Sequence, residues 1–462
     1  MSNIIRDSYW KDFFKTYLMS NVYWYIPKGY SIKKENFELI KKQLEILHKY
    51  RNKKWNKDLQ TSIREDLKNS NLFSPKAEDQ KEDDKNAIVR VMKVIASTLG
   101  LAWVKDNENL SITQIGEKLL QNKDYTNIIE NQIKRFQFNK YTAKDNIKII
   151  PVLYLAKILL KLKDKYITKD EYCLFISKKL NIEDIDKSVE EIEKYRLLKD
   201  KDKNKIKEYL KNEKIKNIKN NRRTSILNTI EKESSYAINF FCSSNLFYFS
   251  DSKILILNEK ELKSFIKTNE KISVWIDFKE KKDWFYYYGN YDADKSSAEF
   301  ALDYYTDISD IDKAVSTFSD YKNKKIKLPD NIKNISEEDF KSVLVDEKIL
   351  EDFLERHIEE LEKGLKLVGR QYPTISGPID LLAKDNNGRF VVIELKKNRV
   401  SDKVIGQVSR YVSFLEDEGH RDIRTIIVGK NIDNNIKLSI KQLKCETVLY
   451  SFDYKVNFTR VY

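Results

Sequence analysis

Residues 376–415 decide the fold of the C-terminal part of the chain, and they read SGPIDLLAKDNNGRFVVIELKKNRVSDKVIGQVSRYVSFL. Residues 379–383 and 390–395 are apolar segments of strand length, and the Asn-Asn-Gly between them is typical of a tight turn. We therefore expect a β-hairpin that is followed by an amphipathic helix. Side chains alternate along a strand, so Glu394 and Lys396 are expected to point to the same face of the second strand.

Two carboxylates are expected to meet in this hairpin. Asp380 and Glu394 each lie several residues from the turn, on opposite strands, so pairing of the strands brings their side chains together. Mg²⁺ prefers carboxylate, carbonyl and water oxygens as ligands. Lys396 can lower the pKa of a bound water or hold a hydroxide in line with a phosphodiester. The pattern predicts a site for phosphodiester hydrolysis, in which the carbonyl of Leu395 is a further metal ligand.

The Glu-x-Lys tripeptide alone is not specific, because residues 261–263 repeat it inside a predicted helix. The tripeptide at 394–396 differs because it ends an apolar strand and follows the Asp380 of Gly-Pro-Ile-Asp. In the helix after it, Gln407 and Tyr411 are four residues apart and share a face. These three features together favour a catalytic site.

The stretch GLKLVGRQYPTISGPIDLLAKDNNGRFVVIELKKNRVSDKVIGQVSRYV, residues 364–412, resembles the PD-(D/E)XK nuclease domain of the NucS type. Asp380, Glu394, Lys396 and the pair Gln407 and Tyr411 match the motifs of that family. The resemblance implies an α/β domain with a mixed central sheet, which we place at residues 336–462. It also implies hydrolysis by Mg²⁺-activated water, with Mn²⁺ as a substitute ion.

The resemblance implies further site residues before the hairpin. Such domains usually add a glutamate from the preceding helix, and Glu347, Glu351 and Glu355 share one helix face here. We favour Glu347 or Glu351, with Glu351 as a metal ligand. Arg370 is expected to reach a phosphate of the substrate.

Residues 1–335 are predicted to be mainly helical, with two small hairpins between helices. The first such unit comprises a helix at 86–99, strands at 101–104 and 110–113, and a helix that Thr113 caps. A similar order recurs from residue 236 to the capping box Asn258-x-x-Glu261. Helix, hairpin, helix is compatible with a winged helix. We therefore predict a multidomain chain with a helical, winged-helix DNA-recognition region at residues 1–223. Residues 224–335 are predicted to be a second winged-helix-like recognition domain or a linker domain.

Aromatic residues are concentrated at 284–288, which read WFYYY, close to the WIDF of residues 275–278. One interpretation is a surface that stacks on nucleic-acid bases. The other is a pair of strands, which we favour because aromatic residues are enriched in strands.

Composition excludes several classes of protein. The chain has 462 residues, of which 41% are hydrophobic and 34% charged, which is not the composition of a disordered protein. Three cysteines and three scattered histidines do not fit a disulfide scaffold or a thiolate zinc site. No apolar run suits a signal peptide or a membrane span, so we expect a cytoplasmic protein without a membrane partner.

The charge indicates a polyanionic partner. The formal net charge is +14, and residues 201–223 alone carry ten basic residues against three acidic ones. A basic run of this kind is either a phosphate-contacting surface or basic linker, or a solvated helix face, and we favour the former interpretation.

The segments at 84–104, 110–120 and 128–140 are similar to AlwI-like and related type IIS restriction endonucleases. This resemblance implies a type II enzyme that cuts double-stranded DNA at a specific sequence, with a cognate DNA methyltransferase and a homodimer during cleavage. A structure- or mismatch-specific repair endonuclease is the alternative, and a DNA-binding regulator with an inactive nuclease domain is an alternative of another class. The candidate DNA-binding residues besides Arg370 are Gln114, Gln132, Lys134, Arg135, Arg222 and Arg223.

Overall fold

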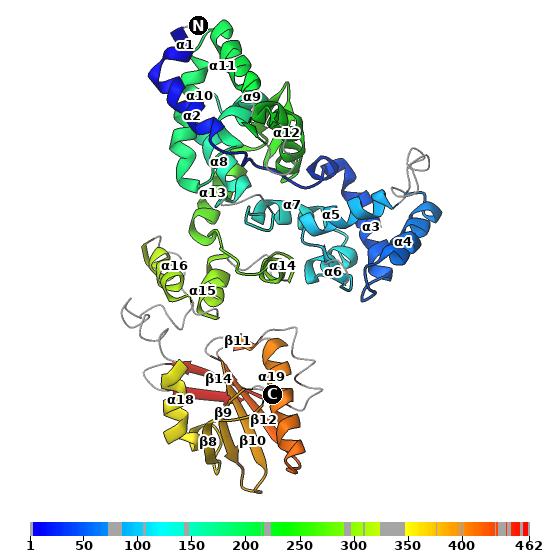
Figure 1. Ribbon diagram of the computed structural model, residues 1–462, viewed down its shortest axis with the longest axis vertical. Helices are drawn as coiled ribbons and strands as arrows, with labels where there is room; N and C mark the ends of the chain where they lie inside the picture. The colour runs from blue at the N-terminus through cyan, green and yellow to red at the C-terminus, as the bar shows by residue number, and fades with distance from the viewer. Residues whose placement is uncertain are drawn as a thin grey trace. The chain divides into compact units, whose positions relative to one another are not determined.

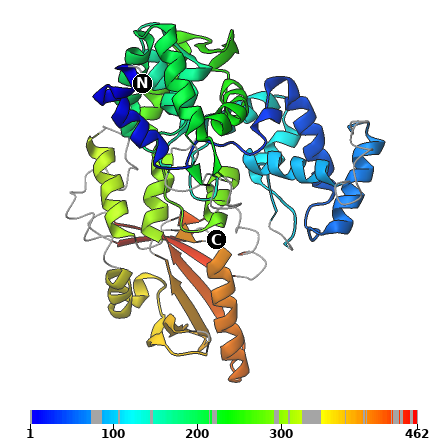
Figure 2. The same cartoon turned by 45° about the horizontal axis from the view of Figure 1, so that its top comes forward.

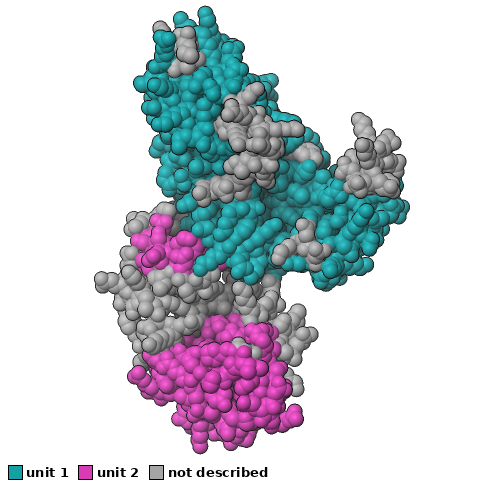
Figure 3. All heavy atoms as spheres, in the orientation of Figure 1, with its two compact units in different colours: residues 1–295 teal, residues 296–462 magenta. Residues whose placement is uncertain are grey.

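The structure is a computed structural model. It describes residues 3–72, 86–104, 108–142, 147–213, 215–216, 223–290, 297–307, 310–323, 347–375, 377–396, 399–400, 402–429, 431–432, 440, 445–452 and 456–460. The chain divides into two compact units, residues 1–295 and residues 296–462 (Figure 3).

The first unit is mainly helical, as predicted. Its helices are α1 (Asn3–Arg6), α2 (Ser8–Leu18), η1 (Gly29–Ser31), η2 (Lys34–Asn36), α3 (Phe37–Lys49), α4 (Lys57–Asn69), α5 (Ala87–Thr98), α6 (Gln114–Gln121), α7 (Tyr125–Arg135), α8 (Pro151–Lys161), α9 (Lys169–Glu171), η5 (Tyr172–Ile176), η6 (Ile182–Asp184), α10 (Ile185–Arg196), α11 (Asp200–Asn212), α12 (Ile226–Cys242), α13 (Glu259–Ile272) and α14 (Lys281–Asn290). Its strands are β1 (Ala102–Trp103), β2 (Ser111–Ile112), β3 (Tyr166–Thr168), β4 (Ile215–Lys216), β5 (Arg223–Thr224), β6 (Phe247–Ser250) and β7 (Lys253–Ile256). The longer helices bury an apolar stripe each, which accounts for this core.

Both predicted helix-hairpin-helix units are present in the described residues. In the first unit, α5 leads through the antiparallel pair β1–β2 into α6, whose N-terminus Thr113 caps by accepting a hydrogen bond from the Gly116 amide at 3.1 Å. In the second, α12 leads through β6 and β7 into α13, which Asn258 caps. The second hairpin is part of a three-stranded sheet and not of the predicted pair alone, because β3 also pairs with β7. The winged-helix assignment of these units stays a prediction.

The prediction of a strand pair at the aromatic run is wrong, because residues 281–290 form the helix α14. Trp284 and Tyr288 are four residues apart and therefore share a helix face, where their rings stack with centroids 4.5 Å apart. Both side chains are buried, and the Tyr288 hydroxyl donates to the carbonyl of Gln132 at 2.8 Å. This aromatic run is therefore core and not a base-stacking surface.

Contacts cross residue 223, where a domain boundary was predicted, and the predicted division into domains stays a prediction. Strand β7 pairs with β3 from before that boundary. The Gln137 amide donates to the carbonyl of Ile276 at 2.7 Å, and the Trp275 indole donates to the carbonyl of Phe138 at 2.6 Å. These long-range contacts make residues 224–290 part of the first unit. The predicted boundary at 335 lies outside the described residues.

The second unit contains the predicted α/β domain. Its helices are α15 (Ser297–Asp307), α16 (Ile311–Asn323), α18 (Glu347–Arg356), η7 (Ile358–Glu360) and α19 (Asp402–Asp417). Its strands are β8 (Lys366–Tyr372), β9 (Ile379–Lys384), β10 (Phe390–Leu395), β11 (Arg399–Val400), β12 (Arg424–Gly429), β13 (Asn431–Ile432), β14 (Glu446–Phe452) and β15 (Val456–Arg460).

A six-stranded mixed sheet, in the order β15-β14-β12-β10-β9-β8, organises this domain. Strands β10, β12 and β14 are parallel neighbours, whereas the other neighbours are antiparallel. Figures 1 and 2 place α18 and α19 on opposite sides of the sheet. Leu350 and Leu354 of α18 pack in one core with Ile393, whereas Tyr411 of α19 packs with Val392. The alternation expected for the second strand is therefore confirmed, and the mixed sheet is present as predicted.

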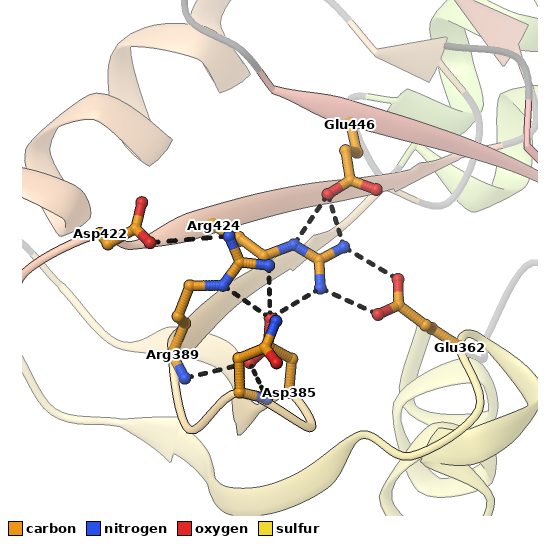
Figure 4. Close-up of polar contacts among 7 residues, drawn as sticks. Glu362, Asp385, Arg389, Asp422, Arg424 and Glu446 are labelled. Atoms are coloured by element: carbon orange, nitrogen blue, oxygen red, sulfur yellow. Dashed lines mark hydrogen bonds and ion pairs between the residues drawn. The ribbon is translucent and has the colours of Figure 1, made fainter.

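An ion-pair cluster closes the end of the sheet where β9 turns into β10 (Figure 4). Arg424 Nη1 and Nη2 contact Glu362 at 2.8 and 2.9 Å, and its guanidinium also contacts Asp385 at 3.2 Å and Glu446 at 2.6 Å. Burial alone would raise the pKa of Asp385, but hydrogen bonds from the backbone and guanidinium of Arg389 and from Arg424 hold that pKa below its ordinary value. The cluster therefore fixes the turn that sets the hairpin register.

Replacing Arg424 with Met is expected to destabilise the second unit by about 3 kcal/mol, because three carboxylates lose a partly buried cation. Urea unfolding at neutral pH measures the change. Arg421→Met is the matched control, because Arg421 is exposed on the same approach to β12. An unchanged midpoint for Arg424→Met would show that the cluster contributes nothing to stability.

Candidate active site

Asp380 and Glu394 lie side by side on neighbouring strands. Strands β9 and β10 are antiparallel, and the pair Leu381–Ile393 is one step before the position at which Asp380 faces Glu394. Residues that face each other across a ladder point to the same side of the sheet. The hairpin register thus brings together the two carboxylates that the sequence singled out, at the opposite end of the strands from the Arg424 cluster.

Hydrogen bonds hold this pair in place. The Leu395 amide donates to Asp380 Oδ2 at 2.8 Å, and Lys396 Nζ lies 2.6 Å from Glu394 Oε1. Glu394 is fully buried, whereas the Lys396 side chain is partly exposed. Asp380, Glu394 and Lys396 therefore converge at one place, with the ammonium group at its solvent side.

The electrostatics of the pair favour a bound cation. Burial, followed by the charge of Asp380, raises the pKa of Glu394 to about 7, although Lys396 acts in the opposite direction. Burial also raises the pKa of Asp380, against the hydrogen bond from the Leu395 amide. Two carboxylates that repel each other at short range are stabilised by a positive charge between them.

A divalent cation fits the residues that are present. Glu394 Oε2 is buried and has no hydrogen-bond partner among the residues that the structure describes, so a carboxylate oxygen is available at the pair. Within the described ranges, no group of three or more His, Cys, Asp and Glu side chains is arranged to hold a metal. Mg²⁺ commonly uses one or two carboxylates and completes its shell with carbonyl, water and phosphate oxygens. The carbonyl of Leu395 remains the predicted third protein ligand.

The helix glutamate is connected to the pair, but through other side chains. Glu351 Oε1 accepts hydrogen bonds from Arg370 Nε at 2.9 Å and from Gln371 Nε2 at 2.7 Å. Gln371 Nε2 also lies 3.3 Å from Asp380 Oδ1. The structure therefore connects Glu351, one of the two favoured glutamates, to the site. Glu347 begins α18, and its side chain lies outside the described residues.

Gln407 and Tyr411 form a second support of the site, on α19. Gln407 Nε2 donates to the Tyr411 hydroxyl at 2.7 Å, and that hydroxyl donates to the carbonyl of Pro378 at 2.7 Å. Gly377 precedes this proline and has a backbone φ of +108°, which residues other than glycine rarely adopt. The pair therefore holds the turn that leads into Asp380. Burial raises the pKa of Tyr411, and the nearby Glu394 and Asp380 raise it further, so the hydroxyl stays protonated.

The predicted DNA-binding residues have varied surroundings. The prediction that Gln132 contacts DNA is wrong. The residue is 1% exposed and its amide donates to the carbonyls of Leu99 and Tyr288, so it belongs to the core. Gln114 is exposed at the start of α6, and Lys134 is partly exposed on α7. Arg135 donates to the carbonyl of Tyr287 at 2.9 Å and lies over its ring.

Three further arginines were predicted to contact DNA. Arg370 is held by Glu351, Asp352 and Glu355. Arg222 lies outside the described residues, and Arg223 starts β5 with a side chain that is not described. The phosphate contacts of these residues stay predictions.

Sequence reasoning missed Gln371. No strand was predicted around Gln371, although the Pro373 two residues later is a signal for the end of an element, and the structure places Gln371 in β8. Only the pairing of β8 with β9 places Gln371 opposite Asp380.

Comparison with known proteins gives matches at both parts of the chain. Residues 346–458 match the model of the endonuclease NucS C-terminal domain, and residues 97–297 match the model of the AlwI restriction endonuclease. The chain thus matches two endonuclease families. Both resemblances seen in the sequence are confirmed, and the candidate active site lies within the NucS-type segment.

Curated relatives and one solved structure resemble the NucS-type segment. Endonuclease NucS of Bifidobacterium adolescentis is 47% identical over 66 residues, which are 14% of this chain and 28% of that protein. Endonuclease NucS of Sulfolobus acidocaldarius is 33% identical over 97 residues, which are 21% of this chain and 38% of that protein. A structure of EndoMS in complex with double-stranded DNA is 26% identical and covers 22% of this chain and 42% of that chain, with a TM-score of 0.21.

The matched segment is shorter than the relatives. The chain spans between 28% and 45% of the length of the first curated relatives that it matches. Among the described residues, no helix combines the length and apolar character needed to cross a membrane.

Proposed function

We propose that this protein is a Mg²⁺-dependent endonuclease that cuts double-stranded DNA at a specific sequence, as a type II restriction enzyme does. The facing pair of Asp380 and Glu394, with Lys396 beside it, carries this proposal. The match of residues 97–297 to a restriction endonuclease supports the restriction assignment, because it covers a part of the chain separate from the nuclease segment.

The residues of the site have distinct roles in this proposal. Asp380, Glu394 and the carbonyl of Leu395 would hold Mg²⁺, or Mn²⁺ in its place, and Glu351 is the further candidate. The bound ion would supply Lewis acidity and neutralise charge on the phosphate that is attacked. Lys396 donates to Glu394 and would orient the attacking water beside it. Gln407 and Tyr411 keep the turn before Asp380 in place.

The first unit would bind the DNA duplex and read its sequence. The formal charge of +14 favours association with phosphates, and Gln114, Lys134 and Arg135 are the described candidates for contact. A cytoplasmic restriction enzyme of this kind would be accompanied by a cognate DNA methyltransferase. A homodimer during cleavage would bring two sites to the duplex, one for each strand.

A plasmid digest tests the proposal. The full-length chain with Mg²⁺ is expected to cut a plasmid into discrete fragments and to leave it intact in EDTA. A repair endonuclease that acts on mismatched or branched DNA is the alternative, which the NucS matches favour. That enzyme would cut mismatched or forked duplexes while it leaves a matched plasmid uncut.

A DNA-binding regulator with an inactive nuclease domain is the candidate of another class. The presence of Asp380, Glu394 and Lys396 argues against it, because loss of activity removes the selection that retains such residues. DNA binding without any Mg²⁺-dependent cleavage, on matched, mismatched or forked duplexes, would establish it.

Replacing Tyr411 with Phe is expected to lower the single-turnover cleavage rate about tenfold, because the Pro378 carbonyl loses the hydroxyl that holds the turn before Asp380. The ring and its packing remain, so the melting temperature should change little. Tyr372→Phe is a control with a partly buried tyrosine of the same domain. Cleavage by Tyr411→Phe at the wild-type rate would exclude this support role.

A further inference from the structure

Gln371 occupies an unusual position beside the candidate metal site. On β8 it lies between Arg370, which faces Leu381, and Tyr372, which faces Ile379, so its own partner across the ladder is Asp380. Asp380 in turn faces Glu394 on β10. Gln371, Asp380 and Glu394 therefore form one row across three neighbouring strands.

The backbone of Gln371 is strained. Its φ is +46°, in the left-handed region that non-glycine residues seldom adopt, and it lies within a β-strand. Such a conformation is unfavourable for a residue with a side chain and persists where the surrounding structure imposes it. Strain of this kind is concentrated at functional sites.

The side chain of Gln371 connects two carboxylates. Its Nε2 lies 2.7 Å from Glu351 Oε1 and 3.3 Å from Asp380 Oδ1. An amide group has two N–H donors and can therefore serve both acceptors at once. The Leu395 amide binds Asp380 Oδ2, so each oxygen of the Asp380 carboxylate has its own donor.

The other end of this connection is anchored on α18. Arg370 Nε donates to Glu351 Oε1 at 2.9 Å, and its Nη1 lies 2.6 Å from Asp352 and 2.8 Å from Glu355. One guanidinium thus neutralises acidic side chains along one face of the helix. Glu351 is therefore a fixed acceptor, against which Gln371 can orient Asp380.

We propose that Gln371 is a positioning residue that holds the Asp380 carboxylate, through its amide, in the orientation that receives the metal ion. This inference rests on the proposed function. A glutamine suits the role because its amide is neutral and donates to both carboxylates, whereas a glutamate would add a third negative charge. An asparagine is one methylene shorter and falls short of both acceptors.

Titration of the full-length protein with Mn²⁺ tests the proposal, with free Mn²⁺ measured by electron paramagnetic resonance in the absence of DNA. Gln371→Gly and Gln371→Asn both tolerate the left-handed backbone and both remove the bridge. Each is expected to weaken Mn²⁺ binding roughly 10- to 100-fold, as is typical when a partner that orients a metal ligand is lost. The urea midpoint of the metal-free protein should not fall for Gln371→Gly, because glycine relieves the strain.

Lys366→Gly is the matched control, because Lys366 is an exposed residue of the same strand. It is expected to leave Mn²⁺ affinity unchanged. Should either variant of Gln371 fail to fold, the other decides. Folded variants that bind Mn²⁺ within about twofold of the wild-type affinity would overturn the positioning role.

Asp380→Asn in the same titration separates this inference from the proposed function. Binding by the wild type, its loss in Asp380→Asn and wild-type affinity in both Gln371 variants would refute the role of Gln371 alone. A wild-type protein that binds no Mn²⁺ would refute the metal site and the role of Gln371 together.

Discussion

Asp380→Asn is expected to lower Mg²⁺-dependent DNA cleavage by at least about a hundredfold while the protein still binds DNA. The substitution keeps the size of the side chain but removes a negative charge from the facing pair, so a divalent cation loses one of its two carboxylates. The Leu395 amide retains an acceptor in the side-chain oxygen of the introduced asparagine, and the hairpin should therefore fold normally.

Two measurements check this expectation. Single-turnover cleavage reports the chemical step, and a gel-shift titration in Ca²⁺ or EDTA reports DNA binding. Asp417→Asn is the matched control, since Asp417 is exposed at the end of α19 and lies in the same domain. If Asp380→Asn retained Mg²⁺-dependent cleavage near the wild-type rate, the assignment of the active site would be wrong.

Glu394→Gln is expected to abolish cleavage and, at the same time, to stabilise the metal-free protein at alkaline pH. Burial and the neighbouring Asp380 raise the pKa of Glu394 to about 7, above its ordinary value of 4.5. The folded state therefore holds this proton more tightly than the unfolded state. The protonated carboxyl therefore contributes its full share of folding stability below the pKa that Glu394 has in the unfolded state. This contribution is lost as the pH rises through about 7.

By pH 8 the free energy of unfolding of the wild type is expected to fall by at most about 3 kcal/mol, since each unit of pKa difference corresponds to about 1.4 kcal/mol. Gln at this position is neutral at every pH and avoids the loss. Urea unfolding in EDTA at pH 5.5 and pH 8 should show a midpoint that falls for the wild type and stays nearly constant for Glu394→Gln.

Glu416→Gln, an exposed substitution on α19, is the control for this series and should behave as the wild type does. Mg²⁺ should restore the midpoint of the wild type at pH 8 and have no such effect on Glu394→Gln. If the urea midpoints of the wild type and Glu394→Gln depended equally on pH, the raised pKa of Glu394 in the folded state would be contradicted.

The C-terminal site was largely predictable because its determinants are local. The alternation of apolar residues fixed which face Glu394 occupies, and the turn at 385–389 set the register that brings Asp380 opposite to it. Helix spacing likewise placed Gln407 beside Tyr411. These features depend on periods of two and of about 3.6 residues, which a sequence displays directly.

The errors have a common physical cause, because they depend on partners that are distant in sequence. Glutamine is a residue type that often contacts DNA bases, and this suggested a DNA-binding role for Gln132. Its amide instead donates to the carbonyl of Tyr288, and a local sequence pattern does not reveal that contact. The aromatic run at 284–288 is compatible with either a strand or a helix, and its distant partners are Phe136, which contacts the rings of Trp284 and Tyr288, and the carbonyl of Gln132, which accepts from the Tyr288 hydroxyl. Gln371 acquires its role only when β8 pairs with β9.

The extent of the first unit was difficult to predict for the same reason. The basic run at 201–223 has the composition of a linker, but helix α11 occupies much of it and Lys211 pairs with Glu231 of α12. Charge composition reports contact with solvent and does not report which segments share a core.

Sequencing the ends of plasmid DNA that the full-length protein has digested in Mg²⁺ tests the central claim most directly. The proposed restriction activity predicts ends that all lie at a fixed distance from one short sequence, and it predicts no ends with Asp380→Asn or in EDTA. Ends scattered without a common sequence, or cleavage that persists in Asp380→Asn, would contradict it.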